Sequence, residues 1–270
     1  MWAEGSERSV LISGGDRLRY DCQLVLKDVG ERGQEKLRRA SVLVVGAGGL
    51  GAPALYYLAA AGVGRLGVAD DDVVELSNLQ RQILFTTDDI GKSKAETAAV
   101  RLRALNPEVE VEPFGQRLVA ANTLDIVRGY DVVVTAVDNF PTRYLLNDAC
   151  VLERKTLVDG AVLRMVGLAM TIKGGETACY RCLFPEPPPP AAVVSCSEAG
   201  VLGPIPGTIG ALQALEVLKV ITGAGRPLYD RLIQFDGAAM SFTEVEVTRV
   251  PTCPVCGEHP TVTELVDYQD

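Results

Sequence analysis

The chain has 270 residues, 47% of them apolar, which is enough to bury a full hydrophobic core. Its 26 basic and 35 acidic residues give a net charge of −9, and a composition without a basic run argues against nucleic-acid binding. The N-terminus lacks the pattern of a signal peptide, and no uninterrupted apolar stretch is long enough to cross a bilayer, so we expect a soluble cytoplasmic protein without membrane contact.

Residues 1–15 are polar and contain glycine, and we expect them to form a mobile tail before a single domain over residues 16–270. Apolar positions in Leu18–Leu37 favour a helix that packs ahead of the first strand. No repeat or low-complexity tract divides the rest of the chain into modules.

The stretch from Ser41 to Gly51 reads SVLVVGAGGLG and joins an apolar run to a glycine-rich turn. The run Val42–Val45 is typical of a strand that is buried on both faces of a parallel sheet. Glycines that let the backbone turn tightly and approach a ligand follow at Gly46, Gly48, Gly49 and Gly51. The alanine-rich segment Leu50–Gly62 favours a helix whose N-terminus faces the turn. This pattern predicts a phosphate site, most often that of a dinucleotide.

A second apolar run, Leu66–Ala69, ends at Asp70. An acid at the end of the second strand of such a fold usually meets a ribose hydroxyl. The next segment, residues 75–82, places Asn78 and Arg81 in a loop or short helical turn, although an ordinary surface loop has the same composition.

A helix is expected from Asp89 to Asn106, because Pro107 stops it. Lys94 lies in its first turn, where the helix dipole disfavours a cation, and this position favours a ligand-facing role. Lys92 is a competing candidate because it lies only two residues away.

A further buried strand over Asp131–Val137 ends at Asp138 and Asn139. Ligands of doubly wound sheets bind outside the carboxyl ends of the strands, so we expect Asp138 near the glycine turn, where its carboxylate suits Mg²⁺. The alternative is that Asp138 caps the helix that begins at Phe140.

Strand and helix segments alternate along the chain, which predicts an α/β fold with a doubly wound, Rossmann-like, mainly parallel sheet. An apolar helix is expected over Gly207–Gly223. Strand-like runs at Arg231–Phe235 and Phe242–Val247 then predict a C-terminal antiparallel extension of the sheet.

Two CxxC motifs supply four thiolates, at Cys179, Cys182, Cys253 and Cys256. Four such ligands predict a closed, tetrahedral Zn²⁺ site that ties the C-terminal part to the middle of the domain. Redox pairs and core cysteines are the alternatives. Cys150 lies in an apolar helix and is most simply a core residue.

Cys196 lies in a proline-rich, irregular segment. An exposed loop cysteine can act as a nucleophile, although the nearby Glu198 should raise its pKa. An inert loop thiol is the alternative.

Five motifs together resemble the ubiquitin-activating-enzyme-like adenylyltransferases (ThiF/MoeB/HesA type) that charge sulfur-carrier proteins. They are Gly46-Ala-Gly-Gly-Leu-Gly51, Ser77-Asn-Leu-Gln-Arg-Gln82, Asp138-Asn139, the paired CxxC motifs and Cys196-Ser-Glu-Ala-Gly200. The resemblance runs from about Arg19 to Cys256, and the combination is far more specific than each motif alone.

The resemblance implies that ATP, with Mg²⁺, adenylates the C-terminal Gly-Gly carboxylate of a ubiquitin-like sulfur carrier for molybdopterin, thiamine or tRNA-thiolation metabolism. It also implies a structural Zn²⁺ and a homodimer. No rhodanese-like domain follows Asp270, so we expect a separate sulfur donor such as a cysteine desulfurase or a rhodanese.

The family's functional residues map onto matching positions of this chain. Asp70 matches the ribose-binding acid, and Asn78 and Arg81 match the phosphate-contacting pair. Lys94 matches the phosphate-binding lysine and Asp138 the magnesium-linked aspartate. The loop cysteine that bonds to the carrier in some members corresponds to Cys196. The resemblance thus implies catalytic roles for Arg81, Lys94, Asp138 and Cys196.

One position departs from the family. Members usually read Arg-Tyr-x-Arg-Gln near the N-terminus, and the second arginine reaches the nucleotide of the other subunit, whereas this chain has Cys22 there. Either adenylation is weaker, or Arg17 or Arg19 substitutes, because a cysteine cannot supply a guanidinium.

Two other functions share parts of this pattern. A nicotinamide-dependent dehydrogenase would share the glycine turn and Asp70, but the sequence shows no hydride-transfer site. A catalytically degenerate interaction partner of the same fold is supported by Cys22 alone.

Overall fold

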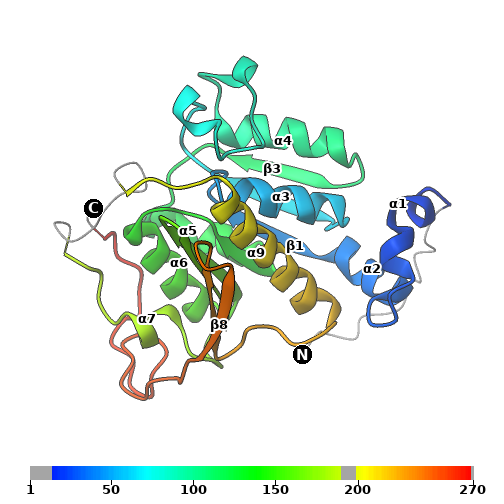
Figure 1. The fold of residues 1–270 in the computed structure, drawn as a ribbon. Helices are drawn as coiled ribbons and strands as arrows, with labels where there is room; N and C mark the ends of the chain where they lie inside the picture. Colours follow the sequence, from blue (N-terminus) through cyan, green and yellow to red (C-terminus); the bar gives the residue numbers. More distant parts are fainter. Residues whose placement is uncertain (1–13, 190–198, 269–270) are drawn as a thin grey trace.

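An eight-stranded mixed sheet forms the centre of the fold (Figure 1), in a computed structural model that describes residues 14–189 and 199–268. The strand order is β3-β2-β1-β4-β5-β6-β7-β8, parallel as far as β5 and antiparallel beyond it. The strands are β1 Ser41–Val45, β2 Arg65–Ala69, β3 Glu110–Phe114, β4 Val132–Thr135, β5 Thr156–Leu163, β6 Val166–Lys173, β7 Arg231–Asp236 and β8 Ser241–Glu246. The predicted parallel sheet with an antiparallel extension is therefore confirmed.

Helices cover both faces of the sheet, as parallel strands require. One buried cluster lies under α3, α4 and α9, and the other under α5 and α6. The helices are α1 Gly14–Leu24, α2 Gly30–Arg39, α3 Gly51–Ala60, α4 Lys94–Leu105, α5 Ala120–Arg128, α6 Phe140–Leu152, α7 Tyr180–Leu183 and α9 Pro204–Thr222. Two short 3₁₀ turns, η1 Leu76–Asn78 and η2 Thr87–Asp89, lie between β2 and α4.

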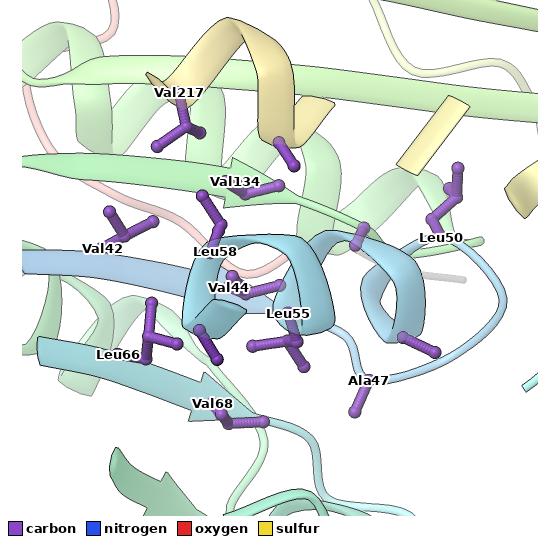
Figure 2. Close-up of a cluster of buried hydrophobic side chains, with 14 of the residues drawn as sticks. Val42, Val44, Ala47, Leu50, Leu55, Leu58, Leu66, Val68, Val134 and Val217 are labelled. Atoms are coloured by element: carbon purple, nitrogen blue, oxygen red, sulfur yellow. The ribbon is translucent and has the colours of Figure 1, made fainter. Parts of the chain in front are cut away.

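The apolar run of β1 divides its side chains between the two clusters. Val42 and Val44 face α3 and α9, where they lie beside Leu58 (Figure 2), whereas Leu43 and Val45 face α6. The four side chains from Val42 to Val45 are at most 4% exposed, which explains why these four positions of β1 are all apolar.

The order of the parallel strands reverses between β1 and β4. The chain runs outward from β1 to β2 and β3, and then returns to the other side of β1 with β4 and β5. Neighbouring loops point in opposite directions at such a switch point and leave a crevice at the carboxyl ends of the strands. The glycine turn follows β1 and Asp138 follows β4, so both lie at this crevice.

The structure corrects several expected boundaries. The helix expected over Leu18–Leu37 is two helices, α1 and α2, with a turn between them and a positive φ of 56° at Gly30. Residues 1–13 lie outside the described residues, and α1 already begins at Gly14, inside the expected tail. The strand expected to reach Val137 ends at Thr135.

The helix expected from Asp89 begins only at Lys94. Gly91 has a φ of 85°, which stops the preceding 3₁₀ turn from continuing as a helix, and Ser93 caps α4 by accepting a hydrogen bond from the Glu96 amide at 3.4 Å. The sequence Ser-x-x-Glu at residues 93–96 is a capping-box pattern that predicts this start.

By length and mean hydropathy, α9 would be able to cross a membrane, although Glu216 and Lys219 interrupt its apolar residues. The helix instead packs against α3 and the sheet and contributes Ile209, Ala214, Val217 and Ile221 to the core. Its apolar composition therefore reflects burial within the fold.

Candidate functional site

The glycine turn has two residues that only glycine can occupy without strain. Gly46 has a φ of 95°, and a Cβ there would lie 2.5 Å from the Ala136 carbonyl oxygen. A Cβ at Gly51 would overlap the Gly46 carbonyl oxygen. The turn is therefore closed by contacts of backbone with backbone, and it brings Gly48 and Gly49 to the wall of a cavity.

This cavity has a volume of about 350 Å³ and lies at the carboxyl ends of the parallel strands. Its wall includes Gly46, Gly48 and Gly49 after β1, Asp70 after β2, and Asp138 after β4. Gly51 lies outside the lining, so its role is to close the turn. The cavity wall also holds three basic side chains, at Arg81, Lys94 and Arg117.

Asp70 links the end of β2 to the glycine turn. Its Oδ2 accepts a hydrogen bond from the Ala47 amide at 2.7 Å, and its Oδ1 accepts one from the Asp72 amide at 3.0 Å. Burial raises the pKa of the Asp70 carboxyl, and the Ala47 amide and Lys94 partly offset this rise. The carboxylate is thus fixed beside the turn, as a ribose-binding acid requires.

The predicted phosphate-contacting pair separates in the structure. Arg81 lines the cavity, and its Nη1 donates to the Ser77 carbonyl oxygen at 3.1 Å. Asn78 is buried outside the cavity lining, and its Oδ1 accepts from the Glu75 amide at 3.1 Å. Asn78 therefore shapes the turn that carries Arg81.

Lys94 lines the cavity, whereas the competing Lys92 does not. The Lys94 side chain is buried, and its Nζ lies 2.8 Å from Asp72 Oδ2, so this acid holds it at the cavity wall. Lys92 Nζ lies 3.2 Å from Asp89 Oδ1 and is largely exposed. Lys94 is the first residue of α4, and its side chain lies at the cavity wall.

Asp138 and Asn139 divide the two roles that the sequence left open. Asn139 caps α6, because its Oδ1 accepts a hydrogen bond from the Thr142 amide at 2.9 Å. Asp138 lines the cavity and makes no hydrogen bond or ion pair with another described residue. Arg143 donates from Nη2 to Val137 O at 3.2 Å and to Gly160 O at 2.9 Å, which fixes the backbone next to Asp138.

Sequence reasoning missed two parts of the cavity wall. Gln82, next to Arg81, is buried and lines the cavity. Residues 116–118, which follow β3, line it as well. The rule that ligands bind beyond the carboxyl ends of strands would have indicated the second part, because β3 is a parallel strand of the same sheet.

The four CxxC cysteines meet in one cluster, although 70 residues separate the two motifs. Their sulfur atoms all lie within 4.8 Å of one another, with Cys179 and Cys253 Sγ 3.6 Å apart and Cys182 and Cys256 Sγ 3.4 Å apart. Tetrahedral Zn–S bonds of about 2.3 Å would separate the sulfurs by about 3.8 Å. All four are free cysteines, so the cluster fits Zn²⁺.

Four other residues lie away from this cavity or outside the described part of the chain. Cys196 falls in residues 190–198, which the structure does not describe. Cys22 is exposed on α1. Arg17 pairs with Glu31 and Arg19 donates to Leu105 O, and neither lines the cavity of its own chain.

Comparison with known proteins decides the family. Residues 20–255 match the sequence model of the ThiF family. The chain belongs to the ThiF family. The resemblance seen in the motifs is therefore confirmed.

Named relatives of this ThiF-family chain cover most of it. The sulfur carrier protein adenylyltransferase of Thermus thermophilus is 56% identical over 256 residues, covering 93% of this chain and 94% of that protein. The mouse adenylyltransferase and sulfurtransferase MOCS3 is 50% identical over 259 residues, covering 96% of this chain. The chain spans only 56% of the length of the mouse protein.

Solved structures of similar fold include E. coli MccB with AMPCPP and MccA, at a TM-score of 0.76 and 26% identity, covering 84% of this chain and 69% of MccB. PaaA has a TM-score of 0.77 over 92% of this chain and 78% of its own. At 23% identity, PaaA shows a shared fold only.

Proposed function

We propose that this protein adenylates the C-terminal Gly-Gly carboxylate of a ubiquitin-like sulfur-carrier protein with ATP. One observation carries the proposal: a single cavity combines the glycine turn, Asp70, Arg81, Lys94 and Asp138. The Thermus relative, 56% identical, is named as an enzyme of this type.

The chemistry joins the carrier carboxylate to the α-phosphorus of ATP and releases pyrophosphate. A carboxylate is already ionised at neutral pH, so no general base is needed and the protein has to position two anions and neutralise their charge. Arg81 and Lys94 supply positive charge at the cavity wall. The glycine turn offers backbone amides at the N-terminus of α3, where a phosphate is stabilised.

A divalent cation fits this charge balance. The cavity wall carries four carboxylates, at Asp70, Asp71, Asp72 and Asp138, against three basic side chains, so the wall alone does not neutralise a triphosphate. Asp71 and Asp138 are the two of these carboxylates that make no hydrogen bond or ion pair with another described residue, and Asp138, which follows β4, would hold Mg²⁺. The bound ion would supply further positive charge to the phosphate oxygens.

The zinc cluster has a different task in this proposal. Cys179, Cys182, Cys253 and Cys256 would hold Zn²⁺ as a closed site with four protein ligands, and such a site stabilises the fold. Cysteines stay reduced most readily in a reducing compartment, which is in keeping with a cytoplasmic location. The sulfur itself would come from a separate donor protein such as a cysteine desulfurase or a rhodanese.

We also propose a homodimer, as the resemblance implies. An apolar groove of about 320 Å³ between α1, α3 and α9 supports it, with Tyr57, Leu215 and Leu218 among its lining residues. Analytical ultracentrifugation of the purified protein tests this part: a sedimentation coefficient of a monomer at micromolar concentration contradicts it.

The experiment that tests the function is mass spectrometry of purified Gly-Gly carriers after incubation with the protein, ATP and Mg²⁺. The proposal predicts a carrier whose mass has increased by one adenylyl group. Carriers that keep their mass while the protein binds NAD would favour the dehydrogenase, an alternative that these relatives do not favour.

A further inference from the structure

Two buried glutamines differ in how the fold uses their side-chain amides. Gln213 of α9 donates from Nε2 to Thr135 O at 2.7 Å and to Val158 O at 3.2 Å, so its amide ties the helix to the sheet. The Oε1 atoms of both glutamines are buried without a partner, but Gln82, which is only 4% exposed, differs in that its Nε2 also makes no hydrogen bond with another described residue. An unused side-chain donor on a buried residue is not explained by packing, so the Gln82 Nε2 is available to a ligand.

The position of Gln82 shows what its amide faces. Gln82 lines the nucleotide cavity, and its Nε2 lies 3.5 Å from the place that a Cβ would take at Gly48. The backbone of Gln82 is fixed by η1, because its amide donates to Asn78 O at 2.9 Å. The side chain therefore lies over the glycine turn, in the same wall as Arg81.

The turn beneath Gln82 is in direct contact with the acid assigned to the ribose. Asp70 Oδ2 accepts from the Ala47 amide, and Gly48 is the next residue. The phosphoryl group that follows the ribose in ATP is the α-phosphoryl group. If the ribose of a nucleotide is bound at Asp70, its α-phosphoryl group therefore lies beside Gly48, within reach of the side-chain amide of Gln82.

We propose that Gln82 binds the nucleotide by donating a hydrogen bond from Nε2 to an α-phosphoryl oxygen. The inference rests on the proposed function, because it requires ATP in this cavity. When the carrier carboxylate attacks the α-phosphorus, negative charge on the phosphoryl oxygens has to be stabilised, and a fixed neutral donor does this without losing its proton. Gln82 complements Arg81, which supplies charge at the same wall.

The test compares Gln82→Met with Gln213→Met, which removes a buried glutamine amide that is bonded to the sheet. Isothermal titration calorimetry measures the affinities of the full-length protein for ATP, AMP and adenosine. We expect Gln82→Met to bind ATP and AMP about tenfold more weakly, equal to about 1.4 kcal/mol, and to bind adenosine normally.

The variant that loses nucleotide affinity, Gln82→Met, should keep its stability, and the variant that keeps its affinity, Gln213→Met, should lose stability. Without nucleotide, Gln82→Met should melt at or above the wild-type temperature, because it removes an unpartnered amide. Gln213→Met should melt lower and keep the wild-type affinity for ATP, because its amide bonds only to the backbone of the sheet.

Gln82→Glu provides a second test that does not depend on the methionine variant. A carboxylate over the turn should repel the phosphate and weaken ATP binding by more than tenfold. The loss relative to the wild type should shrink as the pH is lowered and the glutamate becomes a neutral donor. A loss that is independent of pH contradicts the hydrogen bond.

The remaining outcomes separate this inference from the proposed function. Wild-type protein that binds ATP, together with Gln82 variants of unchanged affinity for ATP and AMP, overturns the role of Gln82 alone. An equal loss for adenosine overturns it too, because the contact would then be with the nucleoside. Wild-type protein that binds none of these nucleotides overturns the proposed function and this inference with it.

Discussion

Asp138 and Asn139 are neighbours with different tasks at the carboxyl end of β4. Asn139 caps α6, whereas Asp138 lines the cavity and makes no hydrogen bond or ion pair with another described residue. This division is not visible in the sequence, where either residue is a good cap. Only the hydrogen bond to the Thr142 amide shows that Asn139 supplies it, which leaves the acid for the ligand.

Asp138→Ala should therefore reduce carrier adenylation by at least about 100-fold without lowering the melting temperature. Asn139→Ala should destabilise the protein by about 1 kcal/mol through loss of the cap. Differential scanning calorimetry and an adenylation assay measure both effects. An Asp138→Ala variant that unfolds at a lower temperature would show that the acid supports the fold.

From the raised pKa of Asp70 we expect nucleotide binding to depend on pH. Burial raises its pKa, so on acidification the folded protein takes up this proton at a higher pH than the unfolded chain does. Affinity for ATP should fall as the pH drops through the raised pKa, because the ribose hydroxyls lose a charged acceptor and gain only the weaker neutral carboxyl. Titrations of wild type and Asp70→Asn at several pH values check this, and an identical fall in both would refute it.

The same raised pKa has a consequence for stability. Ionising Asp70 in the fold costs free energy as the pH rises through its pKa, and this cost persists at neutral pH. Asp70→Asn removes this cost but also leaves the Ala47 or the Asp72 amide without an acceptor, so the melting temperature at one pH does not isolate it. The melting temperature of the wild type should instead fall relative to that of Asp70→Asn as the pH rises through the raised pKa.

At the scale of elements, the sequence predicted those strands and turns that follow from the local order of apolar residues and glycines. The apolar runs of β1, β2 and β4 and the glycine turn were predicted correctly, because burial on both faces leaves a clear mark. The predicted start of α4 at Asp89 was wrong, because the positive φ of Gly91 and the cap at Ser93 delay the helix until after Ser93. The role of Gln82 was missed because a neutral residue beside an arginine carries no signal until its burial is known.

The C-terminal segment is held to the domain by contacts between elements. Arg181, between the two cysteines of the first motif, forms two hydrogen bonds of 2.8 Å with Asp148 of α6. Tyr268 donates to Asp148 Oδ2 at 2.8 Å. The four-cysteine cluster and this buried ion pair thus hold the same part of the chain to the domain.

Removal of zinc should loosen that part first. Cys256→Ser should lose bound zinc and melt about 5–10 °C lower, because the metal is linked to folding. Metal analysis, calorimetry and limited proteolysis after residue 250 measure this. Cys150→Ala is the matched control, because Cys150 is fully buried outside the cluster and its loss should leave the zinc content unchanged.

At the scale of the whole molecule, the strand order explains why distant motifs cooperate. The order reverses between β1 and β4, so the glycine turn near residue 48 and Asp138 meet at one cavity. The sequence predicted this meeting from the rule for strand ends alone. It gave no indication that Asn78 would lie outside the cavity, because that depends on how η1 packs.

The most direct test of the central claim is ATP–pyrophosphate exchange by the purified protein with candidate Gly-Gly carriers, with and without Mg²⁺. Adenylation predicts exchange that requires both a carrier and Mg²⁺ and that is lost in Asp138→Ala. Absence of exchange with every carrier, in a folded and zinc-loaded protein, would contradict the account. Cys22→Arg would then be the first variant to make.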